Sequence, residues 1–267
     1  MTPTEWGEIG QGRRPSWYLD PLVATQKREE NLALLRRWLS GSVPQRLLKT
    51  DLFEEAYGQD GLLAEFSGAA TIVCGMDVAL STVSAASRKN GCANARFLTA
   101  DVRSLPFCDE SIDLIFSNST LDHFESAGEF QQAVRELARV LRPNGRLIIT
   151  LDNPWNPLYY MLRWAGRLGI GPFFLGYTTS QSGLARALAD AGLEVLDTGL
   201  SIHNPRVVST LLFLATRRLL GSHADGAVRL LLKLFSGLGR LPTRKLTACF
   251  ITACGVKPTN VSPRSRS

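Results

Sequence analysis

The feature that most constrains the fold is a regular alternation of strand-like and helix-like segments in the middle of the chain. The strand-like runs are 71–76, 95–99, 112–117 and 146–151, and the helical patterns between them are 78–90 and 128–141. Strands that alternate with helices form right-handed βαβ units, which build a parallel sheet. Ligands bind such sheets at the carboxyl ends of the strands, so the residues that follow each strand are where chemistry is expected.

The flanking segments extend this pattern to seven strands. Further strands are predicted at 46–50, 193–201 and 246–255, and further helices at 17–39, 158–168, 179–191 and in two stretches of 205–240 broken at 221–226. We therefore expect an α/β fold with a mostly parallel seven-stranded sheet and helices on both faces. The expected organisation is an N-terminal helical cap over 1–44, a main domain over 45–257 with a helical insert at 205–243, and a disordered tail over 258–267.

Composition excludes several classes of protein. The chain has 267 residues, of which 45% are hydrophobic and 20% charged, proportions typical of a globular domain rather than a disordered or fibrous chain. The first 30 residues contain no apolar signal-peptide segment, and no apolar run is long enough for a membrane span. The five cysteines form no CxxC pair, which favours reduced thiols over a zinc site, and we expect a cytoplasmic protein.

Charge is distributed unevenly along the chain. Residues 206–267 carry eleven Lys/Arg against one acid, Asp225, whereas residues 1–205 carry a net charge of −4. Within 206–240 the basic residues interrupt the apolar runs VVSTLLFLATRRLL and VRLLLKLFSGLGRLP. Such a segment suits peripheral membrane contact, a pocket for a hydrophobic acceptor, or simple packing on the sheet. Nucleic acid is a weaker expectation, because the cations alternate with Leu and Phe rather than with stacking aromatics on a polar surface.

Acidic residues follow two of the predicted strands. Asp77, after the second strand, is placed to accept hydrogen bonds from both hydroxyls of a ribose, and it is equally placed to cap the next helix. Asp101, after the third strand, could accept from an adenine amine while the N–H of Val102 serves a ring nitrogen. The alternative for this pair is an ordinary turn with a capping aspartate.

A polar run, SNSTLDHF (117–124), follows the fourth strand. His123 is a candidate general base, because the pKa of histidine lies near neutrality. The competing interpretation is that Asp122 and His123 cap the next helix or line a pocket without transferring protons.

Three motifs taken together resemble a known family. TIVCGMDVALSTVSAA, ARFLTADVRSLPFCDESIDLIFSNSTLDHF and FQQAVRELARVLRPNGRLIITLDNP, in this order, resemble the class I S-adenosylmethionine-dependent methyltransferases of the small-molecule "type 11" group. The resemblance implies a Rossmann-like fold, S-adenosyl-L-methionine as cofactor and a small-molecule acceptor. It also implies that Asp77 binds the ribose, Asp101 and Val102 the adenine, and Ser117 the methionine part of the cofactor.

One stretch departs from the family pattern. Where the family has a glycine-rich DxGxGxG turn after the first strand, residues 47–63 read LLKTDLFEEAYGQDGLL. In one account this is a longer loop in which Asp51 or Glu55 meets the cationic part of the cofactor and Gly58 permits close approach. In the other, the cofactor site has decayed and the protein is a non-catalytic relative. The first account predicts a methyltransferase acting on O, N or C of a hydrophobic acceptor; a nucleic-acid-binding methyltransferase is a further alternative.

Overall fold

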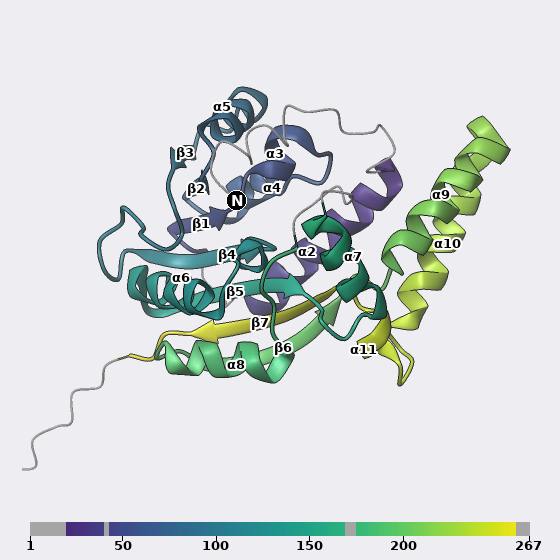
Figure 1. The fold of residues 1–267 in the computed structure, drawn as a ribbon. Coiled ribbons are helices and arrows are strands. Elements are labelled where there is room, and N and C mark those ends of the chain that lie inside the picture. The colour runs from purple at the N-terminus through teal and green to yellow at the C-terminus, as the bar shows by residue number, and fades with distance from the viewer. Residues whose placement is uncertain (1–19, 40–42, 169–174, 260–267) are drawn as a thin grey trace, which may run out of the picture.

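The computed structural model describes residues 20–39, 43–168 and 175–259, and within them seven strands form one sheet in the order β3-β2-β1-β4-β5-β7-β6 (Figure 1). The strands are β1 Arg46–Thr50, β2 Ile72–Asp77, β3 Ala95–Thr99, β4 Ile112–Asn118, β5 Leu141–Asp152, β6 Glu194–Ser201 and β7 Phe250–Val256. All neighbours pair in parallel except β7, which runs antiparallel to both β5 and β6. The predicted mostly parallel seven-stranded sheet is confirmed.

Helices cover both faces of this sheet. They are α2 Pro21–Trp38, α3 Phe53–Tyr57, α4 Leu63–Ala69, α5 Leu80–Lys89, α6 Ala127–Val140, α7 Pro157–Arg167, α8 Gln181–Asp190, α9 Arg206–Leu220, α10 Ala224–Leu238 and α11 Arg244–Thr247. The strands supply both cores because successive side chains point to opposite faces. Leu48 and Ile115 pack with α6 and α8, whereas their neighbours Leu47 and Leu114 pack with α2, α4 and α5. A buried sheet of this kind explains the near-continuous apolar sequence of its central strands.

Most element boundaries follow the sequence pattern, and three regions differ. The helices α3 and α4 form where a loop was predicted. The last strand starts at Phe250 rather than at residue 246, because α11 occupies Arg244–Thr247. Residues 142–145, between the predicted helix 128–141 and the predicted strand 146–151, lie inside β5, where the pairing with β4 is irregular and Asn144 has a φ of 62°. The start of the predicted helix at 17–19 and most of the predicted tail, 260–267, lie outside the described residues.

The helices α9 and α10 form an antiparallel hairpin beside α2 (Figure 1). Phe213, Val228 and Leu232 make a small core of their own, and Leu22 and Val23 of α2 pack against it. Arg217 reinforces this attachment through a 2.6 Å ion pair with Asp20, the N-cap of α2. The hairpin therefore has a fixed inner face on the domain. Across the described segments, every helix is too short or too polar to cross a bilayer.

The start of α6 offers a test of the local structure. Ser126 caps the helix by accepting from the N–H of Glu129, and the Glu129 carboxylate accepts from the N–H of Ser126 in return. We expect Ser126→Ala to lower the free energy of unfolding by about 1 kcal/mol, because a helix N–H loses its partner. Urea denaturation measures this. Ser87→Ala, at an exposed position inside α5, is the control and should leave stability nearly unchanged; equal effects of the two substitutions would contradict the capping role.

Candidate active site

The carboxyl ends of β1, β2 and β4 meet at one edge of the sheet. β1 lies between β2 and β4, and the order of the strands reverses direction along the chain at this point. Open α/β sheets bind ligands at such a switch point. Asp51, Asp77 and Ser117, three of the residues predicted to bind cofactor, stand at or just beyond these strand ends. The predictions for these residues themselves remain to be tested.

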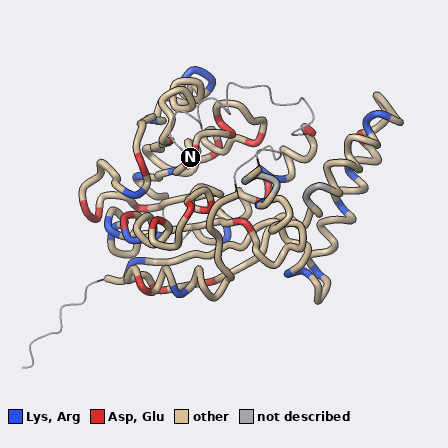
Figure 2. Tube along the Cα trace, in the orientation of Figure 1, with Lys and Arg blue, Asp and Glu red and all other residues tan. Residues whose placement is uncertain are grey.

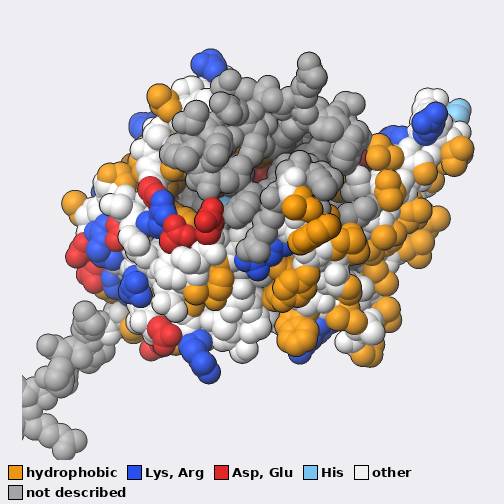
Figure 3. All heavy atoms as spheres, viewed as in Figure 1, with side chains coloured by type: hydrophobic (Ala, Val, Ile, Leu, Met, Phe, Trp, Pro, Cys, Tyr) orange, Lys and Arg blue, Asp and Glu red, His pale blue; other side chains and the backbone are white. Residues whose placement is uncertain are grey.

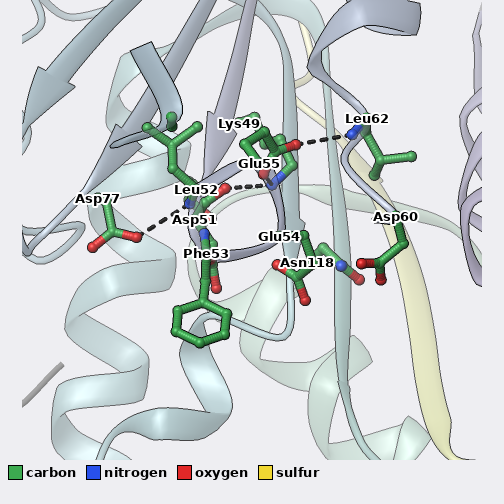
Figure 4. A network of polar contacts seen from close by, with 12 residues as sticks. Lys49, Asp51, Leu52, Phe53, Glu54, Glu55, Asp60, Leu62, Asp77 and Asn118 are labelled. Atoms are coloured by element: carbon green, nitrogen blue, oxygen red, sulfur yellow. Dashed lines mark hydrogen bonds and ion pairs between the residues drawn. The ribbon is translucent and has the colours of Figure 1, made fainter. Parts of the chain in front are cut away.

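A buried ion pair organises the segment after β1. The Lys49 ammonium lies 2.8 Å from the Glu55 carboxylate, and both side chains are almost fully buried. The other Glu55 oxygen accepts from the N–H of Leu62 at 2.9 Å, and Lys49 also donates to the carbonyl of Asp51 (Figure 4). Burial lowers the pKa of Lys49, but the surrounding carboxylates, Glu55 foremost, raise it above its ordinary value. Charged contacts thus shape a connection that a glycine-rich turn forms in the family that the sequence resembles.

Asp77 holds two backbone segments in place. One carboxylate oxygen accepts from the N–H of Leu52 at 3.1 Å and the other from the N–H of Ala79 at 2.8 Å, so the carboxylate joins the β1 connection to the start of α5 (Figure 4). The Asp77 backbone carbonyl accepts from Ala100, directly before Asp101. Burial raises the pKa of Asp77 above the ordinary aspartate value, and the two N–H donors oppose that rise. Each oxygen keeps a second acceptor direction for a hydroxyl donor.

The carboxylates beside Asp77 differ strongly in their acidity. Burial, together with the negative charges of Glu54 and Asp77, holds the pKa of Asp51 well above its usual range. Burial also acts to raise the pKa of Glu54, but Lys27, at 3.0 Å, and Lys49 bring it down to about 2. Lys27 pairs with Asp60 as well, at 2.7 Å. Of the two acids predicted to meet a cationic ligand, Glu55 is engaged with Lys49 and Leu62, whereas Asp51 accepts from the backbone N–H of Phe53 at 2.6 Å.

The residues after β3 form a compact turn. The Asp101 carboxylate accepts from the backbone and side chain of Arg103, with one ion-pair distance of 2.6 Å, and these contacts lower the pKa of Asp101 despite its partial burial. Val102 is buried in the core. β2 and β3 pair with Asp77 opposite Thr99, so the predicted ribose and adenine residues do belong to neighbouring strand ends. To bind an amine, the Asp101 carboxylate would have to accept hydrogen bonds from that amine and from Arg103 at the same time.

Ser117 and Gly58 have structural partners of their own. The buried Ser117 hydroxyl accepts from the hydroxyl of Thr50 at 2.9 Å, and Thr50 also contacts Thr120 at 2.8 Å, which links β1 to the residues after β4. At Gly58 an added Cβ would lie 2.9 Å from the Glu54 backbone, and the Gly58 carbonyl accepts from Lys89. The end of α3 therefore requires glycine whether or not a ligand approaches it.

A second carboxyl pair lies where β4 and β5 end. Asp122 and Asp152 are both buried, and the N–H of Asp152 donates to one Asp122 oxygen at 2.8 Å. The other Asp122 oxygen is buried with no hydrogen-bond partner in the structure. Burial and the negative charge of Asp152 raise the pKa of Asp122 to about 6, although the adjacent His123 opposes the shift. His123 ends the short 3₁₀ helix Leu121–His123 and is partly exposed beside this pair.

Sequence reasoning did not anticipate either the Lys49–Glu55 pair or the Asp122–Asp152 pair. The signal for the first was a lysine inside the apolar run RLLKT of a central strand, since a buried lysine needs an acidic partner. The second joins a residue of the 3₁₀ helix after β4 to the last residue of β5, two positions that the sequence alone does not bring together. In the part of the chain that the structure describes, no group of three or more His, Cys, Asp or Glu side chains is arranged to hold a metal ion.

Comparison with known proteins finds similarity to methyltransferases over part of the chain. Residues 55–149 match the family model described as a methyltransferase domain. Malonyl-[acyl-carrier protein] O-methyltransferase 1 of Coxiella burnetii is 36% identical over 83 residues, which make up 31% of this chain and 26% of that protein. The uncharacterized methyltransferase YcgJ of Bacillus subtilis is 37% identical over 28% of this chain and 30% of its own length. The matched segments thus span less than a third of either relative.

Solved structures resemble the chain over nearly its whole length. The N-methyltransferase NodS of Bradyrhizobium japonicum, solved with S-adenosyl-L-homocysteine, superposes with a TM-score of 0.58 at 15% identity, covering 97% of this chain and 100% of that one. The YcgJ structure gives a TM-score of 0.55 at 22% identity over 86% of this chain and 99% of that one. At these identities the likeness shows a shared fold.

The buried ion pair leads to a prediction about stability. Lys49→Met leaves the Glu55 carboxylate buried without its cation, and we expect a loss of about 3–5 kcal/mol in the free energy of unfolding. Lys49→Met combined with Glu55→Gln should recover most of that loss, because the amide oxygen can still accept from Leu62. Urea denaturation of the single and double variants measures the coupling. Additive losses in the double variant would show that the pair does not act as a unit.

The raised pKa of Asp122 predicts a dependence of stability on pH. An acid whose pKa is about 6 when folded and 3.8 ordinarily binds its proton more tightly in the folded state, so its stabilising contribution is complete at low pH and is lost as the pH rises through 6. Relative to Asp122→Asn, the unfolding free energy of the wild type should fall by about 2 kcal/mol between about pH 4 and about pH 7. Urea denaturation across this range tests it, and a constant difference between the two proteins would refute it.

Proposed function

We propose that this protein transfers a methyl group from S-adenosyl-L-methionine to a small, hydrophobic acceptor, because residues 55–149 match the family model of a methyltransferase domain. The observation that carries the proposal is the Asp77 carboxylate, fixed by two backbone N–H groups at the end of β2 next to the β1 connection. It is a preorganised acceptor at the position where the family resemblance expects the ribose hydroxyls.

The donor and acceptor groups at this sheet edge suit the proposed cofactor. Asp77 would receive the ribose hydroxyls, the N–H of Val102 a ring nitrogen of adenine, and Asp101 the adenine amine. Asp51 would face the cationic amino group or sulfonium, because opposite charges attract at short range in a partly buried site. Ser117 and Gly58 would act through the backbone shape that they maintain around the methionine part.

When bound, the cofactor supplies a methyl carbon on a positively charged sulfur, which makes the carbon electrophilic. The chain would hold the acceptor so that its lone pair points at that carbon along the line of the carbon–sulfur bond. The acceptor would take the methyl group as the carbon–sulfur bond breaks, and the sulfur would keep the electron pair. Where the acceptor carries a proton, His123 is the proposed base that takes it.

Binding of S-adenosyl-L-homocysteine tests the proposal before any acceptor is known. We expect it to raise the melting temperature of the wild type, because a ligand that prefers the folded state stabilises it. Asp77→Asn, which keeps one acceptor oxygen, should weaken binding by about ten-fold or more in calorimetry, in line with the loss of a charge-assisted hydrogen bond. Asp190→Asn, at an exposed position in α8, is the matched control and should bind as the wild type does.

The outcomes separate the two accounts of the altered β1 connection. Binding that depends on Asp77 supports a functional site with a longer connection. Failure of the folded wild-type protein to bind S-adenosyl-L-homocysteine or S-adenosyl-L-methionine would support the non-catalytic relative instead. Binding that Asp77→Asn leaves unchanged would remove Asp77 from the site.

A further inference from the structure

The face of the molecule that carries α7 and the α9–α10 hairpin is unusually apolar. Figure 3 shows hydrophobic side chains gathered over this side of the molecule, in contrast to the mixed charges over the opposite end. On α7 and the residues flanking it, the exposed large side chains are Trp155, Tyr160, Met161, Trp164 and Leu168. On the hairpin they are Val208, Leu211, Leu212, Leu219, Leu220, Leu230 and Leu234. We call these residues together the apolar face.

The exposed leucines are distinct from those that attach the hairpin to the domain. Phe213, Val228 and Leu232 point inward to the small core shared with α2, whereas Leu219 is 81% exposed. Leu230 and Leu234 follow one another by one helical turn, so they form an outward stripe along α10. A hairpin that served only to cover the sheet would need apolar residues on its inner side alone.

Cations border this stripe at close spacing. Arg229 and Lys233 are exposed and each directly precedes an exposed leucine of α10. Arg240, Arg244 and Lys245 continue the basic series after the hairpin, and Figure 2 shows Lys and Arg along α9, α10 and the connection that follows. The single acid in residues 206–267, Asp225, is paired with Arg217. The local excess of positive charge therefore remains available to an anionic partner.

We propose that the apolar face binds peripherally to a bilayer containing anionic phospholipids, with the leucine and tryptophan side chains in the outer acyl region and the cations at the headgroups. The apolar side chains then contact hydrocarbon while the cations contact negative charge, because such an interface offers both within a few ångströms of each other. Exposed Trp and Tyr are the aromatic residues that favour this boundary. The contact is peripheral, since the described helices are too short or too polar to span a membrane.

The charge pattern favours a bilayer over the other occupants of an apolar surface. A second copy of this chain would bring its own Arg229 and Lys233 towards an equally basic surface, which is unfavourable. A nucleic acid would match the charge but would leave the exposed leucines against a polar backbone. An anionic lipid surface is the one partner among these that matches both components.

The position of the apolar face relates it to the candidate active site. α7 follows the carboxyl end of β5 and α9 follows that of β6, and both strands run parallel to β1 and β2. The helices of the apolar face thus follow strand ends at the same edge of the sheet as Asp77 and Asp122. This placement is independent of whether the protein proves to be a methyltransferase.

Vesicle flotation tests the proposal with the full-length protein. We expect the wild type to float with vesicles of phosphatidylcholine mixed with phosphatidylglycerol and much less with phosphatidylcholine alone. Leu219→Glu combined with Leu234→Glu should lower partitioning at least about ten-fold, because two apolar contacts with lipid become charged. Arg229→Gln combined with Lys233→Gln should lower it by about 30-fold, since each cation near an anionic surface contributes about 1 kcal/mol.

Matched variants control for the added or removed charge. Leu80→Glu combined with Leu196→Glu changes two exposed leucines elsewhere, on α5 and β6, and should float as the wild type does. Arg88→Gln combined with Arg135→Gln does the same for exposed cations outside the hairpin. Thermal denaturation verifies that each variant is folded. Equal flotation of all variants would overturn the proposal, and so would a wild type that ignores vesicles but sediments as a dimer which Leu219→Glu/Leu234→Glu dissociates.

Discussion

The geometry of the candidate site depends on Lys49, which is buried in the central strand β1. An ammonium group at the end of β1 is costly unless an acid meets it, and Glu55 does so from the first helix after the strand. That requirement positions α3, and the second Glu55 oxygen then holds Leu62 at the start of α4. The Leu52 N–H is left pointing at Asp77, so the same connection joins β1 to β2. One ion pair thereby performs a task for which glycine-rich turns use backbone conformation and helix N-terminal N–H groups.

The sequence predicted the helices and strands that have a periodic pattern of apolar residues. It missed the elements that depend on an individual tertiary contact. The strands 46–50 and 95–99 were predicted to the residue, because short β-branched or apolar runs bounded by polar residues leave little freedom. The short helices α3 and α4 were missed. The acids of α3 pair with Lys49 and Lys27 rather than forming the polar side of an amphipathic stripe. The start of the last strand was placed too early, because Leu246 and Thr247 suit a strand locally and form a helical turn here.

For the site, sequence predicted which strand ends carry acids but not how those acids are engaged. Asp77 and Asp101 lie on adjacent strand ends, as the βαβ pattern requires. Asp101 is engaged locally, by an arginine two residues away, whereas Asp122 meets Asp152, which lies thirty residues further along the chain. Burial and charge then set the acidity of each group, and neither can be read from a residue's own neighbours in sequence.

The clustered acids also matter for the proposed reaction, because that reaction removes the positive charge of the sulfonium. Methyl transfer converts a positively charged sulfonium into a neutral thioether, so a carboxylate held too close would stabilise the reactant more than the transition state. In this structure Lys27 and Lys49 offset Glu54 and Glu55, while burial and its acidic neighbours keep the pKa of Asp51 high. A cation bound beside Asp51 would lower that pKa and draw the carboxylate into its charged form; loss of the cation's charge would reverse the effect. An acid of this kind attracts the charged cofactor and holds its neutral product less tightly, which favours exchange of product for a new cofactor after each transfer.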